Sequence, residues 1–309
     1  KLRCSPMSKR SGSNVFPPTN TSFNNQFFHM QVFADIWDVY SATRAWRLAA
    51  ERIGFVPTMG NLHAGHLRLI EVARKHTDKV VVSIYVNPMQ FGPQEDFARY
   101  PRTLEADSAR LREAGADLLF TPDDATIYPG GVAQSTYVEV PRLSNILEGM
   151  QRPGHFRGVA TVVNKLFNIV VPDVAVFGDK DYQQLLVIRQ MVRDMSLPIE
   201  IIGEPTVRES DGLALSSRNQ YLSEEERRRA AGLHETLVHL RERIKRQNTN
   251  WSDLEQEGIL RLEKHGFTPD YLAIRHSETL LEPHSAADPL IILAAARLGQ
   301  TRLIDNLRV

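Results

Sequence analysis

Cysteine is almost absent from this sequence of 309 residues. Cys4 is the only one, so the chain cannot close an internal disulfide and offers no cysteine cluster for zinc or an iron–sulfur centre. Such low cysteine usage is typical of proteins that work in a reducing compartment. We therefore expect a cytoplasmic protein.

Long hydrophobic runs are missing as well. The most apolar stretch, residues 159–178, is interrupted by Lys165, Pro172 and Asp173. A membrane-spanning helix needs about 20 consecutive, mostly apolar residues. The sequence therefore predicts no segment that crosses a membrane.

An excess of charge of one sign is absent too, because 37 basic residues balance 37 acidic ones. This balance gives no electrostatic reason to expect nucleic acid or a membrane surface as a partner. The hydrophobic share of 42% and the charged share of 24% are those of an ordinary globular protein. The length predicts two domains.

Residues 1–29 are rich in Ser, Asn and Pro and lack the apolar stretch of a secretory signal. His29 and Met30 form the dipeptide that a common cloning site leaves. We therefore expect residues 1–29 to be a vector-derived or disordered tail, with the native sequence starting at Met30.

From Met30 onward, short apolar runs alternate with helical patterns, which is typical of a parallel sheet covered by helices. We predict an α/β fold with a Rossmann-like, doubly wound parallel sheet over residues 30–206. The spacing of apolar residues predicts one helix that ends before Gly115 and another that ends before Pro198. The predicted strands are Arg52–Val56, Val80–Val86, Asp117–Phe120, Val174–Phe177 and Ile199–Ile202.

The pattern changes after Pro205. Ser223 and Glu226 form a capping-box pattern that predicts one long charged helix through about Lys245. A second helix is expected from about Ser252, followed by strands at Tyr271–Arg275, Leu290–Ala294 and Arg302–Leu307. Residues 207–309 are therefore predicted to form a smaller α+β domain that serves as a lid.

The most informative segment runs from Phe55 to His66, where an apolar strand enters a glycine-containing turn and then a helix. The N-terminus of a helix binds anions through its free N–H groups and its dipole. His63 and His66 lie three residues apart, so both imidazoles can reach one phosphate. Two other readings stay open: the histidines are polar residues on a core helix, or they bind zinc, although H-x-x-H lacks a third ligand. Neither a Gly-Lys-Ser/Thr sequence nor a G-x-G pattern is present, which excludes a P-loop and the usual dinucleotide fingerprint.

Leu62-His-Ala-Gly-His66 resembles the H-x-G-H motif of nucleotidylyl transferases and class I aminoacyl-tRNA synthetases. Further segments narrow the resemblance, and together they are similar to the pantoate–β-alanine ligase family from Met30 to Asn306. These segments are Val86-Asn-Pro-Met-Gln-Phe91, Tyr100-Pro-Arg-Thr103, Phe177-Gly-Asp-Lys-Asp-Tyr-Gln-Gln184 and Thr206 to Asn219.

The resemblance implies an ATP-dependent reaction in two steps. ATP and pantoate give pantoyl adenylate and pyrophosphate, and β-alanine then displaces AMP to form pantothenate. It also implies a homodimer, and Mg²⁺ as a companion of ATP. Because the first step shifts negative charge onto the leaving group, the residues should mainly position the substrates and stabilise charge.

The resemblance also assigns residues. His63 and His66 would contact the phosphates, with His66 as proton donor or as phosphate ligand, and Lys180 would contact phosphate. Ser216, Ser217 and Arg218 would close over the triphosphate, Asp181 would bind the ribose, and Val207 would lie beside the adenine. Gln90 and Gln184 would bind pantoate, and Gln90 is also implicated in binding β-alanine. The complete set expected to bind ATP is Met59, Gly60, Asn61, Leu62, His63, Ala64, Gly65, His66, Gly178, Asp179, Lys180, Asp181, Val207, Leu215, Ser216, Ser217 and Arg218.

The sequence departs from the family pattern at a few positions. Leu215 replaces the commoner methionine, and Ala106 occupies a position that is acidic in some members. The metal ligand is therefore unknown, with Glu105 or Asp107 as candidates. Mg²⁺ often binds mainly through nucleotide phosphates and waters, so a missing carboxylate need not abolish catalysis.

Two other functions agree less well with the sequence. A nucleotidylyl transferase or synthetase that shares only H-x-G-H would not account for the segments around Gln90 and Gln184, and no basic extension of a size to bind tRNA is apparent. A catalytically silent nucleotide-binding module would bind ATP without turnover, whereas His63, His66, Lys180 and Arg218 favour catalysis.

Overall fold

The computed structural model describes residues 30–93, 95–246 and 250–309. The tail expected over residues 1–29 therefore lies outside the described residues. No helix in the described part is long and apolar enough to cross a membrane.

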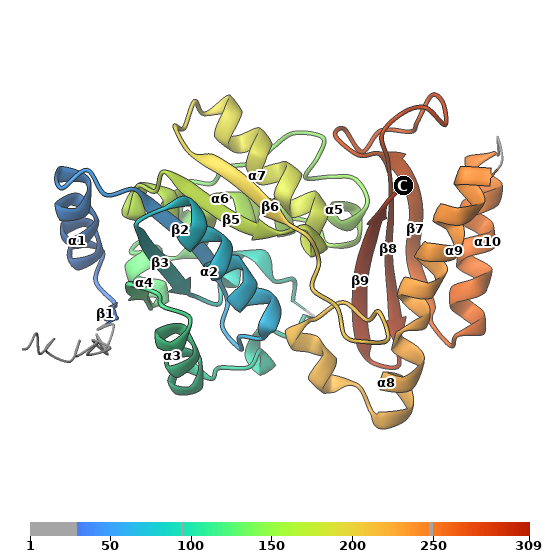
Figure 1. Cartoon of the computed structure of the whole chain (residues 1–309), viewed down its shortest axis with the longest axis horizontal. Coiled ribbons are helices and arrows are strands. Elements are labelled where there is room, and N and C mark those ends of the chain that lie inside the picture. Colours follow the sequence, from blue (N-terminus) through green and yellow to red (C-terminus); the bar gives the residue numbers. More distant parts are fainter. Residues whose placement is uncertain (1–29, 94, 247–249) are drawn as a thin grey trace, which may run out of the picture.

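The larger part of the molecule is built on a six-stranded sheet in the order β1-β4-β3-β2-β5-β6, and every pairing in it is parallel. It lies on the left of Figure 1. The predicted Rossmann-like α/β class is confirmed, and all five predicted strands of this sheet are present. The strands are β1 (Gln31–Phe33), β2 (Ile53–Thr58), β3 (Lys79–Ile84), β4 (Leu118–Phe120), β5 (Val174–Gly178) and β6 (Glu200–Glu204).

The sheet is buried on both faces. Successive side chains of a strand point to opposite sides, so each strand contributes to both cores. On β2, Phe55 joins the core that contains helix α6, whereas Val56 joins the core that contains helix α2. The helices of this part are α1 (Ile36–Leu48), α2 (Ala64–His76), α3 (Leu104–Glu113), α4 (Asp124–Ile127), α5 (Glu148–Gln151), α6 (His155–Val170) and α7 (Tyr182–Asp194). Short 3-10 turns are η1 (Pro88–Gln90), η2 (Phe97–Arg99), η3 (Val132–Gln134) and η4 (Asp179–Asp181).

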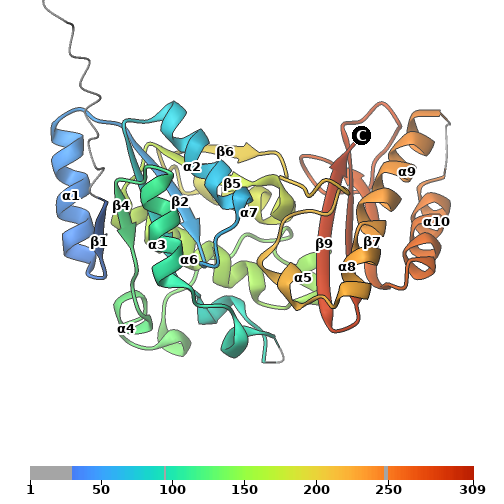
Figure 2. The same ribbon diagram turned by 60° about the horizontal axis from the view of Figure 1, so that its bottom comes forward.

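The carboxyl-terminal part is a three-stranded antiparallel sheet with helices on one face, in the order β7-β8-β9. It comprises η5 (Ser217–Tyr221), α8 (Glu224–Ala230), α9 (Gly232–Arg246), α10 (Trp251–Lys264), β7 (Thr268–His276), β8 (Leu290–Leu298) and β9 (Thr301–Arg308). Figures 1 and 2 both show the small sheet between the parallel-sheet part and the pair α9–α10. The predicted smaller α+β unit is thus present, and its boundary at residues 206/207 stays a prediction.

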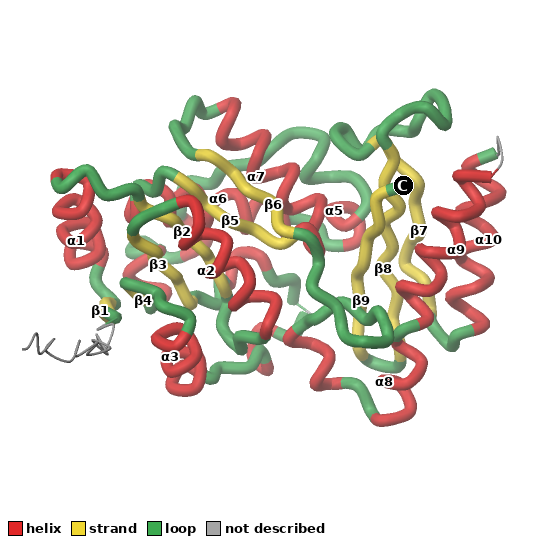
Figure 3. The backbone as a smooth tube through the Cα atoms, in the orientation of Figure 1, coloured by secondary structure: helices red, strands yellow, loops and turns green. Residues whose placement is uncertain are grey.

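One sequence prediction about this part is wrong. The capping box of Ser223 and Glu226 forms as expected, but the helix that it starts ends at Ala230. A new helix begins at Gly232, where an added Cβ would collide with the His265 ring at the end of α10. Close packing of α10 therefore requires glycine at a point where glycine also weakens the helix. Figure 3 labels α8 and α9 in this region.

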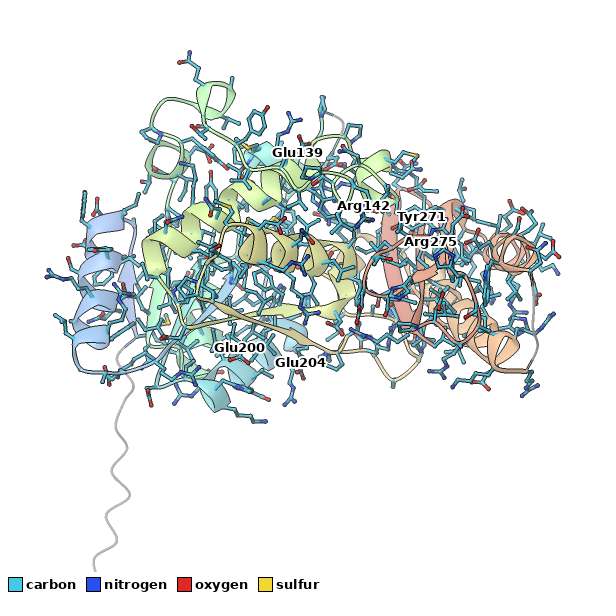
Figure 4. The ribbon with its side chains drawn as sticks, turned by 90° about the horizontal axis from the view of Figure 1, so that it is seen from above. Glu139, Arg142, Glu200, Glu204, Tyr271 and Arg275 are labelled. Carbon is cyan, nitrogen blue, oxygen red and sulfur yellow. The ribbon has the colours of Figure 1, made fainter. Side chains whose placement is uncertain are left out.

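The two parts are joined both by apolar packing, in which Ile291 and Leu293 of β8 share a core with α6 and α7, and by polar contacts. Arg302 on β9 donates to Glu148 Oε1 at 2.6 Å and to Glu148 Oε2 at 2.9 Å, and it also donates to Asp270 Oδ2 at 2.6 Å. Arg142 donates to Thr279 O at 2.7 Å. In Figure 4, Arg142 lies close to the strand that carries Tyr271 and Arg275, and Glu200 and Glu204 mark β6. These links fix the small sheet beside the carboxyl ends of β2 and β5.

Candidate active site

From β2, the sheet extends to one side through β3 and β4 and to the other side through β5 and β6. The site lies at this switch in strand order, between β2 and β5. These strands are direct neighbours, so the turn after β2 and the loop after β5 meet at the same edge of the sheet. In open α/β sheets, ligands bind in this crevice. A single cleft at this edge is lined by residues from both loops, from α6 and from the segment 205–218.

Most of the predicted site residues line this cleft. From the set expected in the sequence these are Met59, His63, Gly65, His66, Gln90, Gly178, Lys180, Asp181, Gln184, Val207, Leu215, Ser216, Ser217 and Arg218. Five others of that set are not among its lining residues: Gly60, Asn61, Leu62, Ala64 and Asp179. Leu62 is 1% exposed and belongs to the core. Asp179 Oδ2 lies 3.9 Å from Arg308 Nη2.

The turn between β2 and α2 is held in place by one buried carboxylate. Asp107 on α3 accepts hydrogen bonds from the backbone N–H groups of Asn61 and Leu62, both at 2.8 Å, and from Thr103 Oγ1 at 2.9 Å. Gly60 adopts a φ of +85° beside this carboxylate, a conformation that favours glycine. Asp107 therefore shapes the turn that presents the two histidines.

The hydrogen bonds of the two histidines determine which ring nitrogen is free. His63 Nδ1 accepts the Gly65 N–H at 3.2 Å, and His66 Nδ1 accepts the His63 N–H at 3.3 Å. An imidazole nitrogen that accepts carries no proton, so the neutral ring has its proton on Nε2. The rings lie side by side, with their centroids 4.1 Å apart. Each histidine can thus offer one N–H to an acceptor in the cleft.

Both imidazoles are strongly biased towards the neutral form. Burial, assisted by the charge of Lys180, lowers the pKa of His63 to about 4. Burial, followed by the influence of His63 and Lys180, lowers the pKa of His66 to about 3. Near neutral pH the free protein therefore holds two uncharged hydrogen-bond donors here rather than two imidazolium cations.

This bias gives the stability of the protein a pH dependence. Unfolding exposes the imidazoles and returns their pKa to about 6.5, so the unfolded chain binds more protons below that pH. Their contribution is fully present above pH 6.5 and declines as the pH falls towards 4. We expect each histidine to cost about 1 to 2 kcal/mol of unfolding free energy between pH 7 and pH 5.

Urea unfolding at a series of pH values measures this effect. His66→Gln should flatten the profile, whereas His76→Gln, at the exposed end of α2, should leave it unchanged. An unaltered profile for His66→Gln would contradict a lowered pKa at this position.

The segment Ser216–Arg218 is docked against the histidine turn. Ser217 Oγ donates to Asn61 O at 3.1 Å. Arg218 donates through Nε and Nη2 to both oxygens of Asp96, at 2.9 Å and 2.8 Å, and lies over the Tyr100 ring. This leaves Arg218 Nη1 without a carboxylate partner among the described residues. The segment lines the same cleft as Lys180.

The amide of Gln90 is positioned by buried neighbours. Asn87 Nδ2 donates to Gln90 Oε1 at 3.1 Å, and Gln90 Nε2 lies 3.2 Å from Met59 Sδ. Gly158 on α6 packs directly on the Gln90 backbone, where an added Cβ would be 2.6 Å from its Cα. By contrast, no described residue hydrogen-bonds to the side chain of Gln184. One glutamine is therefore fixed, and the other has its polar atoms available to a ligand.

Comparison with known proteins agrees with this geometry. The family model described as pantoate-beta-alanine ligase matches residues 31–308. The chain belongs to the pantoate–β-alanine ligase family. It is therefore an enzyme, a ligase, and the family reaction is the ATP-dependent joining of pantoate to β-alanine. The resemblance found in the sequence is confirmed.

Individual relatives cover nearly the whole described chain. A pantothenate synthetase of Shewanella sp. (strain MR-7) is 59% identical over 275 residues, which is 89% of this chain and 98% of the relative. The crystal structure of pantothenate synthetase from Thermus thermophilus is 49% identical, with a TM-score of 0.83, and the match covers 90% of this chain and 99% of the other. The pantoate–β-alanine ligase of Francisella tularensis, solved in complex with β-γ ATP and β-alanine, is 36% identical, with a TM-score of 0.74, over 90% of this chain and 97% of the other.

Among the residues that line the cleft and that sequence reasoning missed are two basic ones, Arg152 and His155. His155 Nδ1 lies 2.9 Å from Gln90 O, and Arg152 contacts Glu95 at 2.6 Å. Burial and the adjacent Arg152 lower the pKa of His155 to about 4, so it is neutral and donates its Nδ1–H to Gln90. The Arg-Pro-Gly-His sequence ahead of an apolar helix was the available signal, since it places two basic residues at a tight turn.

Proposed function

We propose that this cleft binds ATP and pantoate together and forms pantoyl adenylate. The observation that carries the proposal is that three segments, the turn with His63 and His66, the loop with Lys180 and the segment Ser216–Arg218, line a single cleft. In this reaction a carboxylate oxygen of pantoate attacks the α-phosphorus of ATP. The bond from that phosphorus to the oxygen that bridges it to the β-phosphorus breaks, and pyrophosphate leaves.

The two histidines would act as hydrogen-bond donors in this step. Their Nδ1 atoms are occupied by backbone N–H groups, which supports Nε2–H as the group facing the phosphates. With pKa values of about 4 and about 3 in the free enzyme, neither ring carries an extra proton to transfer near neutral pH. This favours the role of phosphate ligand over that of proton donor for His66. A neutral donor aimed at developing charge stabilises the transition state without a proton transfer.

Lys180 and Arg218 would supply the positive charge. Lys180 Nζ lies 3.9 Å from Asp181, which is exposed and can accept the ribose hydroxyls. Arg218 keeps Nη1 for a phosphate oxygen while Asp96 holds the rest of its guanidinium. A fixed guanidinium and an ammonium that line one cleft suit a departing pyrophosphate.

Pantoate would lie between the glutamines and helix α6. It carries a carboxylate and two hydroxyls, and two methyl groups share one of its carbons. It therefore needs amide partners and an apolar wall. Gln90 and Gln184 provide the amides, and Val159, Val162 and Leu166 of α6 provide the wall. In the second step the β-alanine amine attacks the carbonyl carbon of the adenylate, and the carbon–oxygen bond to AMP breaks.

The described residues offer few protein ligands for Mg²⁺ near the candidate positions. They contain no group of three or more His, Cys, Asp or Glu side chains that could hold a metal ion. Both oxygens of Asp107 are engaged by N–H and O–H donors, and Glu105 is exposed on the first turn of α3. Mg²⁺ would accordingly enter with the ATP phosphates and water ligands, and none of the steps above depends on it.

The reaction can be tested directly by following AMP release with ATP, Mg²⁺, pantoate and β-alanine, and by omitting each acid in turn. We expect AMP only when both acids are present and pantoate-dependent exchange of pyrophosphate into ATP without β-alanine. AMP formation that ignores either acid would refute the proposed reaction. The homodimer, the cytoplasmic location and the absence of a nucleic-acid partner also stay predictions, and sedimentation analysis tests the first of them.

Replacement of Gln184 by alanine is expected to raise the KM for pantoate by about tenfold and the KM for ATP by less than twofold. Loss of one hydrogen bond to a small substrate costs about 1.4 kcal/mol at this ratio. Initial-rate kinetics with each substrate varied give both constants. Equal changes in the two KM values would count against a role in pantoate binding.

A further inference from the structure

Two neighbouring polar residues of the small sheet contact segments that lead into the cleft. Asp305 and Asn306 lie on β9, far along the chain from both phosphate-binding segments, and are only 4% and 7% exposed. Burial of an amide beside a carboxylate is costly unless both are hydrogen-bonded. The partners that they use are therefore informative.

Asn306 holds the loop that carries Lys180. Its side-chain Nδ2 donates to Asp179 O at 2.8 Å and to Lys180 O at 2.9 Å. An amide group has two N–H bonds, and both are spent on consecutive carbonyl oxygens of this loop. The small sheet thus helps to fix the backbone from which the Lys180 side chain projects.

Asp305 holds the segment that leads to Ser216–Arg218. It accepts two hydrogen bonds from Arg208, at 2.7 Å and 2.9 Å, and Arg208 also donates to Gly212 O at 3.0 Å. Arg208 lies in a turn that is closed by a hydrogen bond from Leu215 N to Val207 O at 3.0 Å. Burial alone would raise the pKa of Asp305, but His234 and Arg208 hold it below its usual value, so the carboxylate stays charged.

The two residues are also joined to each other. Asn306 N donates to Asp305 Oδ1 at 2.8 Å, and Arg208 Nη2 donates to Asn306 O at 3.2 Å. One short stretch of β9 therefore connects the Lys180 loop with the turn that precedes Ser216. If the Lys180 loop or the turn with Arg208 moved, hydrogen bonds to this buried stretch of β9 would have to break.

We propose that Asp305 and Asn306 are a positioning pair that sets the separation between Lys180 and the Ser216–Arg218 segment during adenylate formation. The inference rests on the proposed phosphate-binding roles of those residues. In this proposal the small sheet determines where the charges of Lys180 and Arg218 lie. Neither residue touches a substrate in this proposal.

Asn306→Asp tests the proposal with a side chain of the same shape. The new carboxylate has no N–H to donate and repels the two carbonyl oxygens, so the Lys180 loop should shift. We expect pantoate-dependent ATP–pyrophosphate exchange to fall at least tenfold. The second half-reaction, conversion of supplied pantoyl adenylate and β-alanine to pantothenate, should also be measured. Its fold-loss should be at least ten times smaller than the fold-loss in exchange. Equal loss in both half-reactions, or no loss in either, would overturn the proposal.

A double-mutant comparison separates positioning from general damage. If Asn306 acts through Lys180, then Asn306→Asp should slow exchange by less than twofold in a Lys180→Ala background. A further tenfold loss in that background would contradict the proposal. Should Asn306→Asp fail to fold, Asn306→Ala, which leaves both carbonyls to water, serves for the same comparison.

Glu255→Gln provides a matched control in the same small domain. Glu255 pairs with Arg275 at 2.6 Å and accepts the Ile274 N–H at 2.8 Å, away from the cleft. This variant should lower the melting temperature but keep the exchange rate within twofold of wild type, and a tenfold slower exchange would overturn the proposal. If the wild-type enzyme itself shows no pantoate-dependent exchange, the proposed function fails. If wild type and Asn306→Asp exchange equally fast, only the positioning pair fails.

Discussion

Replacement of Lys180 by alanine is expected to slow pantoate-dependent ATP–pyrophosphate exchange by about 10² to 10³. Removal of a single charge-stabilising donor has an effect of this size in other active sites, about 3 to 4 kcal/mol. Lys180 lines the cleft from the loop after β5, and Arg218 lines the same cleft from the segment Ser216–Arg218. Arg218 is tied to Asp96 and cannot move to replace the missing ammonium without breaking that pair.

Lys75→Ala is the matched control, because Lys75 is an exposed lysine in the last turn of α2. It should exchange at the wild-type rate. Circular dichroism and the melting temperature should be the same for both variants, since Lys180 is not part of the hydrophobic core. Exchange by Lys180→Ala within threefold of wild type would remove this residue from the phosphate site.

Replacement of His66 by alanine is expected to reduce the single-turnover rate of adenylate formation by about 10² to 10³. The change removes the Nε2–H donor, and it also removes the Nδ1 acceptor for the His63 N–H. His66→Asn separates these two effects, because a shorter amide can accept the backbone hydrogen bond but places its N–H groups elsewhere. We expect His66→Asn to retain the stability of wild type better than His66→Ala and to remain equally slow.

The pH dependence of His66 variants adds a second readout. If the neutral imidazole acts as a donor, the wild-type rate should stay constant from pH 8 to pH 6, because the pKa of His66 in the free enzyme is about 3. A wild-type rate that rises as the pH falls across this range, without a corresponding rise in His66→Asn, would instead indicate that a protonated His66 imidazole donates a proton. His76→Ala serves as the control on the same helix.

The sequence predicted the part of the site that depends on local patterns. An apolar strand followed by a glycine turn and a helix places His63 and His66 at the carboxyl end of β2. The same logic places Lys180 after β5, and the parallel pairing of β2 with β5 brings the two loops together. No long-range information was needed beyond the rule that parallel strands end at one edge.

Contacts between distant residues could not be predicted in this way. Asp107 was considered as a metal ligand because it is acidic and lies in the right segment. Its hydrogen bonds to Asn61 and Leu62 depend on how α3 packs against the turn, which no local pattern encodes. The break between α8 and α9 likewise follows from the position of His265, which comes only after α10 in the chain. Edge strand β1 was missed because such a short strand carries too little periodicity.

The contact between Gly158 and the backbone of Gln90 has a consequence for enzyme engineering. Helix α6 cannot approach Gln90 more closely, and any residue larger than glycine at this position would push the helix and the glutamine apart. Acceptance of bulkier hydroxy acids has to be sought by trimming the valines that α6 turns towards the cleft, with the helix itself left where it is.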